Sequence, residues 1–375
     1  VGREAANEDR EVLGVRVGGP NAGHTVYGKC PRVETGEAAQ AKVRGCVKCN
    51  EFGHPWALRQ VPVLAVTNPE AGLVIAGGSE VDPDVLHAEI MELDAAGYDV
   101  SNRLVVDASA TLLMESHRAA EAGKELQKRL GSTAKGIGGA RVDRLWREAR
   151  TVGLHGGVPP ESYGGPDVAT DTADLMERVL AEGGHVVIEG TQGYGLGLHT
   201  EYYPYTTSGD CRAIDFLAQA GLSPWVLSSR DEEYRPDLKI VVCFRPFPIR
   251  VAGNSGPMGS ETSWEELGLP QEFTTVTQKV RRVAAWDPQL VEAAIRANGG
   301  LGEHLVLALT MADHVVPELK GLTSVDEVGL GADQALQKWI DSSDLSERTR
   351  AQLWDGVLTG ETLFGTGPTT MLGDI

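Results

Sequence analysis

Short apolar runs that alternate with longer amphipathic stretches are the feature that most restricts the fold of this chain. Aliphatic runs predict buried strands at residues 12–17, 61–66, 73–76, 104–106, 186–189, 239–244 and 305–309. Helical periodicity predicts helices at residues 85–95, 110–129, 170–181, 213–220, 289–297 and 331–342. This alternation is typical of an α/β fold with a mostly parallel sheet covered by helices. In such sheets, ligands bind beyond the carboxyl ends of the strands.

Length and charge limit the domain count and the partners. The 375 residues are enough for one large α/β domain, and we predict a single catalytic domain over residues 1–375. A net charge of −19 argues against nucleic-acid partners, whose phosphates need clustered Lys and Arg. No apolar run approaches the ~20 residues of a membrane span. Five cysteines are few and odd in number, which favours a cytoplasmic location over a disulfide scaffold.

Two glycine-rich segments follow predicted strands. GGPNAGHTV offers Asn21 and Thr25 as hydrogen-bonding groups and His24 as a proton donor or acceptor. EGTQGYG adds Gln192, and Thr207 follows a few residues later. Glycines allow a backbone to approach a phosphate or a metal closely, although a tight turn explains the first segment equally well.

Two basic segments suit anionic ligands. In GSTAKGIGGARVDRLWREAR, a small polar loop with Thr133 precedes a helix carrying Arg147, which could hold a phosphate; a solvated helix face is the alternative. In TTVTQKVRRVAAWD, Lys279, Arg281 and Arg282 accompany three threonines. This cationic group suits a dicarboxylate or a phosphate, with a surface salt-bridge network as the alternative.

The polar segment 28–60 is interpreted as an insertion between two strands. It contains four potential zinc ligands, Cys30, Cys46, Cys49 and His54. One C-x-x-C pair is half of a zinc signature, and its spacing to Cys30 is unusual. We therefore favour free cysteines in a surface loop, and a structural zinc site is the alternative.

The order of the motifs is more specific than any one of them. GGPNAGHTV, G-[ST]-T-x-[KR]-G-I-G, EG-x-QG, YPY-x-TS, T-x-[KR]-x-R-R, T-x-x-D and [ST]-x-GP together resemble the adenylosuccinate synthetase family, from about residue 11 to the C-terminus. The resemblance implies a homodimeric, P-loop-related α/β ligase. It couples a 6-oxopurine nucleotide to L-aspartate, using a nucleoside triphosphate and Mg²⁺. O6 is phosphorylated, and the aspartate amine then displaces phosphate from C6.

The resemblance also implies a role for each matching position. His24 and Gln192 would be catalytic, and the carbonyl of Gly23 would contact Mg²⁺. The nucleotide monophosphate would contact Asn21, Ala22, Thr133, Gln192, Thr207 and, from the other subunit of the dimer, Arg147. Aspartate would contact Thr277, Lys279 and Arg281. The triphosphate would contact Asn21, His24, Thr25, Arg281, Asp313, Gly365, Thr366, Gly367 and Pro368.

Three departures from the family pattern concern the substrates. VGREAANEDR stands where the family has a glycine-rich phosphate loop with its general base, and we expect that loop to belong to the protein outside these 375 residues. Met311 replaces the lysine with which the family reads the guanine of GTP, which favours ATP or dATP. Lys279 replaces an arginine.

These departures and the segment TTSGDCRAIDFLAQAG resemble the phage branch of the family. That branch consists of 2-aminoadenylosuccinate synthetases, which take dGMP towards 2-aminoadenine DNA, and a phage enzyme would act in the host cytoplasm. The expected activity is therefore a ligase that joins dGMP to aspartate with ATP or dATP. A cellular enzyme using IMP and GTP is the first alternative, and a non-catalytic nucleotide-binding protein is the second.

Overall fold

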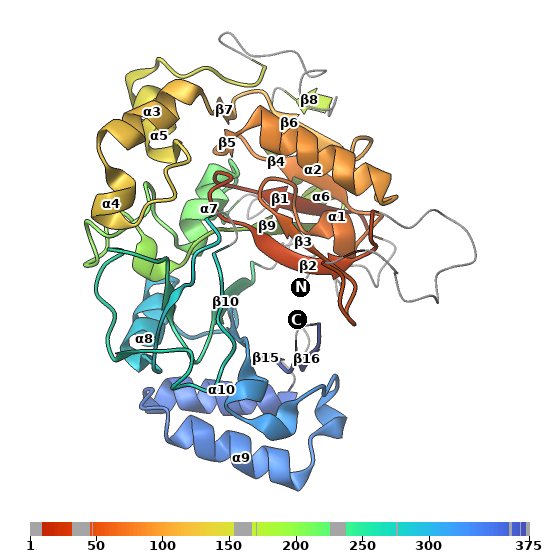
Figure 1. Cartoon of the computed structure of the whole chain (residues 1–375). Coiled ribbons are helices and arrows are strands. Elements are labelled where there is room, and N and C mark those ends of the chain that lie inside the picture. Colours follow the sequence, from red (N-terminus) through yellow and green to blue (C-terminus); the bar gives the residue numbers. More distant parts are fainter. Residues whose placement is uncertain are drawn as a thin grey trace. The chain divides into compact units, whose positions relative to one another are not determined.

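The chain forms two compact units. The computed structural model describes residues 10–31, 46, 48–153, 167–169, 171–225, 238–274, 277–359, 362–367 and 369–372 (Figure 1). The first unit, here the N-terminal unit, comprises residues 2–192 and 207–236; the second, the C-terminal unit, comprises residues 193–206 and 237–375. The single catalytic domain expected from the sequence stays a prediction.

A five-stranded parallel sheet forms the centre of the N-terminal unit, in the order β8-β6-β4-β1-β9. The strands are β1 (Val12–Arg16), β4 (Gly72–Ile75), β6 (Leu104–Asp107), β8 (Asp167–Ala169) and β9 (His185–Glu189). From β1 to β8 the chain adds each strand on one side, and β9 then pairs on the other side of β1. The strand order therefore reverses between β1 and β9, which is where ligands bind in open α/β sheets.

Helices cover both faces of this sheet (Figure 1). They are α2 (Pro83–Ala95) on one face, and α6 (Thr172–Ala181) and α7 (Ala213–Gln219) on the other. Leu86 and Ile90 of α2 belong to one buried cluster with Ile75. Met176 of α6 belongs to a second cluster with Val15. Burial of both faces explains why the strands are continuous apolar runs in the sequence.

A two-stranded antiparallel ribbon leaves the sheet after β1. It consists of β2 (His24–Gly28) and β3 (His54–Leu58), with His24 opposite Leu58 and Gly28 opposite His54. β3 lies within the insertion expected at residues 28–60, so part of that segment is a strand. The connection between β2 and β3 spans residues 29–53. This ribbon therefore carries a histidine at each end.

The strand predicted at residues 61–66 is wrong, because this segment leads into the short helix α1 (Leu64–Thr67). The buried carboxylate of Glu89 accepts hydrogen bonds from the backbone N–H groups of Gln60 and Val61, both at 3.0 Å. Backbone donors bound to a carboxylate are not available to a strand ladder. Burial raises the pKa of Glu89, against the effect of these hydrogen bonds.

The single helix predicted at residues 110–129 is also wrong. The segment contains β7 (Thr111–Leu112), which pairs with β5 (Glu80–Val81), and then α3 (Glu115–Gly123) and α4 (Leu126–Leu130). The helices separate at Glu125, whose φ of 51° is left-handed. The predicted basic helix exists as α5 (Ile137–Trp146).

A mixed sheet forms the centre of the C-terminal unit, in the order β10-β14-β15-β16. The strands are β10 (Ile240–Phe244), β14 (Leu305–Leu309), β15 (Leu363–Gly365) and β16 (Met371–Leu372), of which the last is antiparallel to β15. The helices are α8 (Pro288–Ala297), α9 (Leu330–Asp341) and α10 (Glu347–Thr359), and α10 is a helix that the sequence analysis did not predict. Leu307 of β14 shares a buried cluster with Ile295, Leu336 and Leu353 of the three helices.

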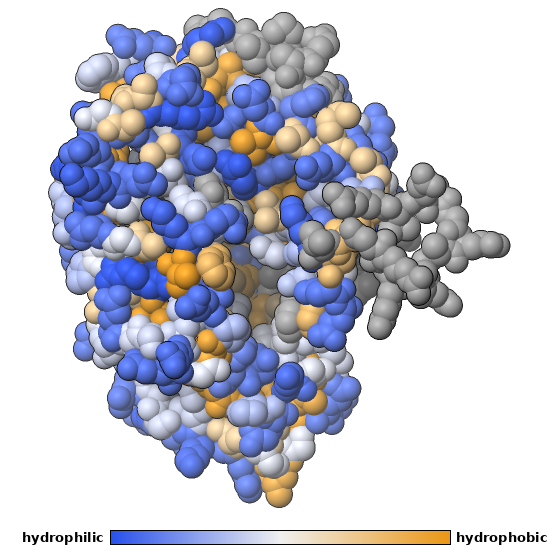
Figure 2. All heavy atoms as spheres, in the orientation of Figure 1, coloured by the Kyte–Doolittle hydropathy of each residue, from blue (hydrophilic) through white to orange (hydrophobic). Residues whose placement is uncertain are grey.

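Smaller elements complete the C-terminal unit. A second sheet has the order β11-β13-β12, with β11 (Ile249–Arg250), β12 (Glu261–Thr262) and β13 (Arg282–Ala284). Short 3-10 turns occupy Tyr194–Leu196, Ala312–His314, Pro317–Leu319 and Val325–Glu327. The face drawn in Figure 2 is mainly hydrophilic, with hydrophobic residues scattered in small groups. Within the described ranges, no helix combines the length and the apolar character that crossing a membrane requires.

Candidate functional site

The loop between β1 and β2 is folded tightly at Gly18 and Gly19. Gly18 has a left-handed φ of 88°, and a Cβ on Gly19 would lie 2.2 Å from Cδ1 of Ile137. Arg59 Nε donates to the Pro20 carbonyl at 2.8 Å. The loop carrying Asn21 is therefore held in one conformation over the sheet edge.

A buried arginine and a glutamate occupy the carboxyl ends of the two strands at the reversal point. Arg16 ends β1, is 1% exposed, and pairs in register with Glu189, which ends β9. Arg16 Nη1 donates to Glu189 Oε1 at 2.6 Å, and Nη2 donates to the carbonyls of Ala22 (3.0 Å) and Arg59 (3.2 Å). This ion pair joins the strand ends to the loop that leads into β2.

His24 completes this network, because its Nδ1 atom contacts Glu189 Oε1 and lies 2.8 Å from Arg16 Nη1. The guanidinium can only donate and the carboxylate can only accept. A proton on Nδ1 therefore goes to Glu189, and Nε2 remains available to a ligand. The imidazole side chain is 33% exposed.

The charge of Glu189 is maintained although the side chain is buried. Burial raises the pKa of this carboxyl group, but the hydrogen bond from His24 and the charge of Arg16 outweigh that effect and lower it overall. Glu189 Oε2 also accepts from the backbone N–H of Val63 at 2.9 Å. An ionised Glu189 can orient the His24 ring and stabilise positive charge on it.

Asn21 and Gln192 meet beside this network. Gln192 Nε2 lies 3.5 Å from Asn21 Oδ1, and Thr191 Oγ1 donates to Gln192 Oε1 at 2.6 Å. Gln192 has a left-handed φ of 63°, a conformation that costs a non-glycine residue free energy and is often found at ligand sites. Thr25 is exposed, and strand alternation directs it away from the ribbon face that carries His24.

The polar loop before α5 places Thr133 on the same unit. Glu121, which is buried, accepts from the backbone N–H groups of Gly136 and Gly138, both at 2.8 Å. These two N–H groups are therefore already bonded, and a phosphate at this loop would depend on residues 132–135. Burial raises the pKa of Glu80. Arg141 of α5, whose Nε donates to Glu80 Oε1 at 2.7 Å, acts in the opposite direction and lowers it.

Thr207 belongs to a segment that lies against α5. Ser208 Oγ lies 3.6 Å from where a Cβ on Gly138 would be, and a Cβ on Gly209 would lie 1.8 Å from Arg141 Nη1. The segment around Thr207 thus packs on the start of α5, close to the Thr133 loop.

Arg147 lies at the end of α5. It ends α5 with a left-handed φ of 65°, it is exposed, and its Nη1 donates to the Leu145 carbonyl at 2.7 Å. Leu145 and Trp146 beside it are each 68% exposed, and Val142 is 43% exposed. The end of α5 therefore exposes three apolar side chains beside Arg144 and Arg147.

In the C-terminal unit, the predicted cationic cluster is only partly neutralised. Arg281 and Arg245 share Glu272, at 3.0 and 2.8 Å. Arg282 instead binds Glu261 with two hydrogen bonds, so the salt-bridge alternative applies to this residue. Within the described ranges, the ammonium group of Lys279 contacts no carboxylate. Burial lowers the pKa of Arg281, and Glu272 opposes this.

Thr277 and the strand-end motifs lie in the same unit. Thr277 Oγ1 is 2.5 Å from Oγ1 of buried Thr274, in the turn that carries Lys279. A Cβ on Gly365 would lie 3.0 Å from the backbone nitrogen of Met311, so the GTGP segment packs directly on the segment leading to Asp313. Thr366 is fully buried and donates to the Leu322 carbonyl, whereas Gly365 and Gly367 on either side of it are partly exposed. Pro368 is outside the described residues.

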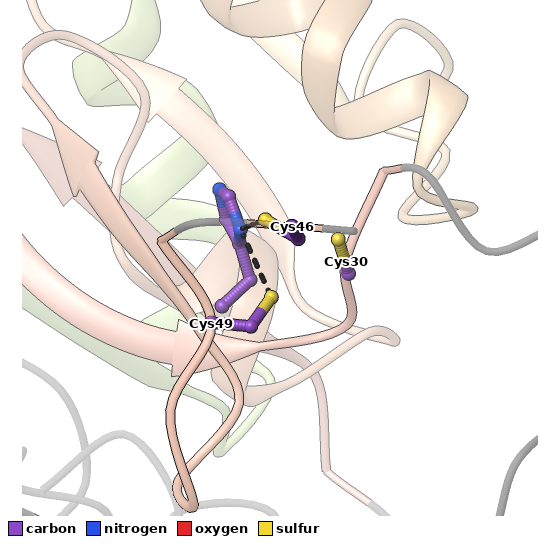
Figure 3. A group of neighbouring side chains, drawn as sticks. Cys30, Cys46 and Cys49 are labelled. Carbon is purple, nitrogen blue, oxygen red and sulfur yellow. Dashed lines mark hydrogen bonds between the residues drawn. The ribbon is translucent and has the colours of Figure 1, made fainter. Parts of the chain in front are cut away.

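The cysteine-containing connection brings all four potential ligands together. The sulfurs of Cys30, Cys46 and Cys49 and a ring nitrogen of His54 lie within 4.8 Å of one another (Figure 3). The sequence analysis favoured free cysteines in a surface loop, and this convergence does not match that interpretation.

Sequence reasoning missed several residues in each unit. They are Arg16, Arg59 and Glu189 in the N-terminal unit, and Arg245 and Glu272 in the C-terminal unit. A usable signal existed for two of them, because Arg16 and Glu189 are charged residues directly at the ends of apolar runs. A charged side chain at that position lies at the ligand-binding edge of a parallel sheet.

Comparison with known proteins identifies a family. The family model described as adenylosuccinate synthetase matches residues 8–155 and 166–323. The adenylosuccinate synthetase of Pyrococcus horikoshii is 32% identical over 290 residues, covering 76% of this chain and 78% of that protein. The enzyme of Methanococcus vannielii is 31% identical over 358 residues, covering 93% and 86%.

Two solved structures are similar over nearly the whole chain. One is the succinoaminodeoxyadenylate synthetase of cyanophage S-2L bound to dGMP and dATP as an energy donor, with a TM-score of 0.67, 26% identity, and coverage of 99% of this chain and 89% of that one. The other is the fully ligated adenylosuccinate synthetase of Plasmodium falciparum, with a TM-score of 0.69, 16% identity, and coverage of 100% and 96%. Both confirm the fold class expected from the sequence, a mostly parallel sheet covered by helices.

Proposed function

Since this chain belongs to the adenylosuccinate synthetase family, whose members are C–N bond-forming ligases, we propose that it joins dGMP to L-aspartate with ATP or dATP. The observation that carries the proposal is the Arg16–Glu189–His24 network beside Asn21 and Gln192 at the strand reversal. The product would be N6-succino-2-amino-2'-deoxyadenylate, a precursor of 2-aminoadenine DNA.

The reaction has two steps. The γ-phosphoryl group moves from the triphosphate to O6 of the purine, whose N1 proton is removed. The aspartate amine then attacks C6, the C6–O6 bond breaks, and phosphate leaves with O6. Phosphorylation is needed because an amide-like oxygen is a poor leaving group, and the site must stabilise negative charge that develops on the phosphoryl group.

His24 is suited to that stabilisation. With Nδ1 held by Glu189, Nε2 can donate to a phosphoryl oxygen, and the ionised carboxylate stabilises the positive ring. Gln192, fixed by Thr191 and Asn21, offers an uncharged amide to the purine edge or to the same phosphoryl group. Asn21, Ala22, Thr133 and Thr207 would complete the nucleotide site.

The Gly23 carbonyl fits a Mg²⁺ ligand. The neighbouring Ala22 carbonyl is bonded to Arg16, whereas none of the described residues donates to the Gly23 carbonyl. Mg²⁺ prefers oxygen ligands and would neutralise charge on the transferring phosphoryl group when bound.

The cluster around Glu272 suits aspartate. Two guanidinium groups, Arg245 and Arg281, share one carboxylate, and Lys279 adds a further positive charge. A dicarboxylate brings the negative charge that this cluster lacks. Thr277 would add a hydroxyl group to that site.

Two observations support dGMP and an adenine triphosphate as substrates. The cyanophage synthetase is similar over 99% of this chain, and its structure contains dGMP and dATP. Met311 has no group that could pair with guanine, and its sulfur lies 2.9 Å from Arg245 Nη2. Asp313 and the GTGP segment, including Gly365, would contact the triphosphate.

The alternative is a cellular enzyme that uses IMP and GTP. It is favoured by the archaeal relatives, which are 31–32% identical and are named adenylosuccinate synthetases. The substrate, rather than the chemistry, separates these two functions.

A homodimer is part of the proposal, because Arg147 is exposed and lies beside the exposed apolar side chains of Leu145 and Trp146. Mixing Arg147→Ala with His24→Asn tests this. Each variant is expected to be impaired alone, and mixed dimers would contain one intact site, restoring about a quarter of wild-type turnover. A mixture with no more activity than its components would contradict an arginine shared across the dimer.

The substrate test compares phosphate release by the full-length protein with aspartate, Mg²⁺ and ATP, using dGMP or IMP. The proposal predicts aspartate-dependent release with dGMP and little with IMP. Release with IMP alone, and faster with GTP than with ATP, would establish the cellular function. Binding of either nucleotide without release would support the non-catalytic alternative.

A further inference from the structure

We propose that Cys30, Cys46, Cys49 and His54 form a structural zinc site that closes one end of the β2–β3 ribbon. This site is separate from the nucleotide site and does not depend on which purine nucleotide the enzyme uses. It rests on the convergence of four ligand atoms, three from the connection between β2 and β3 and one from His54 at the start of β3 (Figure 3).

The distances match a tetrahedral zinc ion. His54 Nδ1 lies 3.6 Å from Cys46 Sγ and 3.5 Å from Cys49 Sγ. Zinc bonds of about 2.3 Å to sulfur and about 2.0 Å to nitrogen give a tetrahedral edge of roughly 3.5 Å between such atoms. All four ligand atoms lie within 4.8 Å of one another, which is compatible with small adjustments around one ion.

The ligand set selects zinc and a structural role. Three sulfurs and one imidazole form a soft, tetrahedral set that zinc prefers over Mg²⁺ or Ca²⁺. Four protein ligands fill the coordination sphere and leave no open position for a substrate. Cys30 and His54 are also buried, at 7% and 8% exposure, as expected for a closed site.

The surrounding residues hold the ligands in place. His54 is the first residue of β3, and Gly53 before it has a φ of 112°, in a turn closed by two hydrogen bonds between Asn50 and Gly53. Trp56 Nε1 donates to the Lys29 carbonyl at 3.0 Å, which fixes the backbone next to Cys30. Trp56 also belongs to the main buried cluster of the unit, so the site is anchored to the core.

The position of the zinc site on the ribbon indicates what the site would stabilise. β2 begins at His24 and pairs with β3 along its whole length, ending where Gly28 faces His54. A ribbon of two short strands is marginally stable by itself. Zinc would fix the end opposite to the catalytic histidine, and a fixed ribbon holds His24 against Glu189.

The test is the metal content of the full-length protein. After expression in zinc-replete medium and dialysis against metal-free buffer, inductively coupled plasma mass spectrometry is expected to find about one zinc per chain. The Cys46→Ser, Cys49→Ser double variant is expected to lose it. Cys243→Ser is the matched control, because Cys243 lies in β10 and is not in the cluster, and it should keep its zinc.

A second measurement covers the case in which the double variant does not fold. Wild-type protein reconstituted with Co²⁺ should show the thiolate charge-transfer absorption and the intense visible bands of tetrahedral cobalt. Folded wild-type protein with less than about half an equivalent of zinc, and no such cobalt spectrum, would overturn the proposal. Iron in place of zinc, or a double variant that keeps its zinc, would also overturn it.

Discussion

The two ends of the β2–β3 ribbon each present a histidine whose Nδ1 atom faces anionic or potentially anionic groups. At one end, His24 faces the carboxylate of Glu189, is one-third exposed and keeps Nε2 available. At the other end, His54 faces the sulfurs of Cys46 and Cys49 and is buried. The difference teaches that the surroundings, and not the residue type, decide whether a histidine keeps a ring nitrogen available to a ligand.

Replacing the two histidines separately should give opposite results, and His24→Asn should have the largest effect on activity. Loss of the imidazole donor is expected to lower kcat by about 10³-fold, because developing phosphoryl charge loses its partner. Zinc content should remain that of the wild type. Phosphate release and metal analysis on the same preparation check both points.

The matched variant is His54→Asn. It should lose zinc and retain most of its kcat at low temperature. Equal losses of kcat in the two variants would break the distinction between the two ends.

Glu189→Gln should lower kcat by about 10²-fold, a smaller effect than loss of His24, because the amide still orients the ring but does not stabilise its charge. Nucleotide affinity should change much less than kcat, which steady-state kinetics can separate. A kcat equal to that of the wild type would show that the charge of Glu189 is unimportant.

The same variant has a pH signature in stability. The folded pKa of Glu189 lies below its ordinary value of 4.5, so its carboxylate contributes stability fully above about pH 4.5 and loses it as the pH falls through the folded value. Urea unfolding of wild type and Glu189→Gln should therefore differ most at neutral pH and converge in acid. A difference that stays constant into acid would contradict the ion pair.

Removing zinc should affect stability more than catalysis. A strong chelator is expected to lower Tm by about 5–10 °C, since 1 kcal/mol corresponds to about 2–4 °C in a domain of this size. kcat should fall by about tenfold or less, through looser positioning of His24. Differential scanning calorimetry with and without chelator measures this, and Cys243→Ser with chelator is the control.

The smallest effect on kcat is expected for Gly53→Ala. A Cβ there would lie 2.7 Å from the Gly28 carbonyl, at a φ of 112°, and should cost about 1–3 kcal/mol of unfolding free energy. kcat at low temperature should stay within about twofold of wild type. Gly97→Ala is the control, because Gly97 also has a positive φ but no atom within 4 Å, and it should cost less.

The sequence predicted the regular parts of the sheets well, for physical reasons that are visible in the structure. β1 and β14 are buried strands and β9 is a partly buried one, so their apolar runs were unambiguous. The prediction at residues 61–66 was wrong because a buried carboxylate, Glu89, bonds the backbone from another element. No local pattern reports such a long-range partner.

The candidate site was predictable to a similar extent. The glycine loops gave His24, Asn21 and Gln192, which the structure brings to one strand reversal. Arg16 and Glu189 were missed because they were interpreted only as the last residues of predicted strands and were not considered as site residues. For the cysteines, spacing along the chain was a poor guide, because the antiparallel pairing of β2 with β3 brings Cys30 close to His54.

The most direct measurement follows the oxygen at C6. The full-length protein is given dGMP labelled with oxygen-18 at O6, together with aspartate, Mg²⁺ and ATP, and the phosphate and purine products are analysed by mass spectrometry. Phosphoryl transfer to O6 followed by displacement predicts that the label appears in inorganic phosphate and is absent from a succinylated purine product. Unlabelled phosphate, or dGMP that keeps its label while ATP is hydrolysed, would contradict the account.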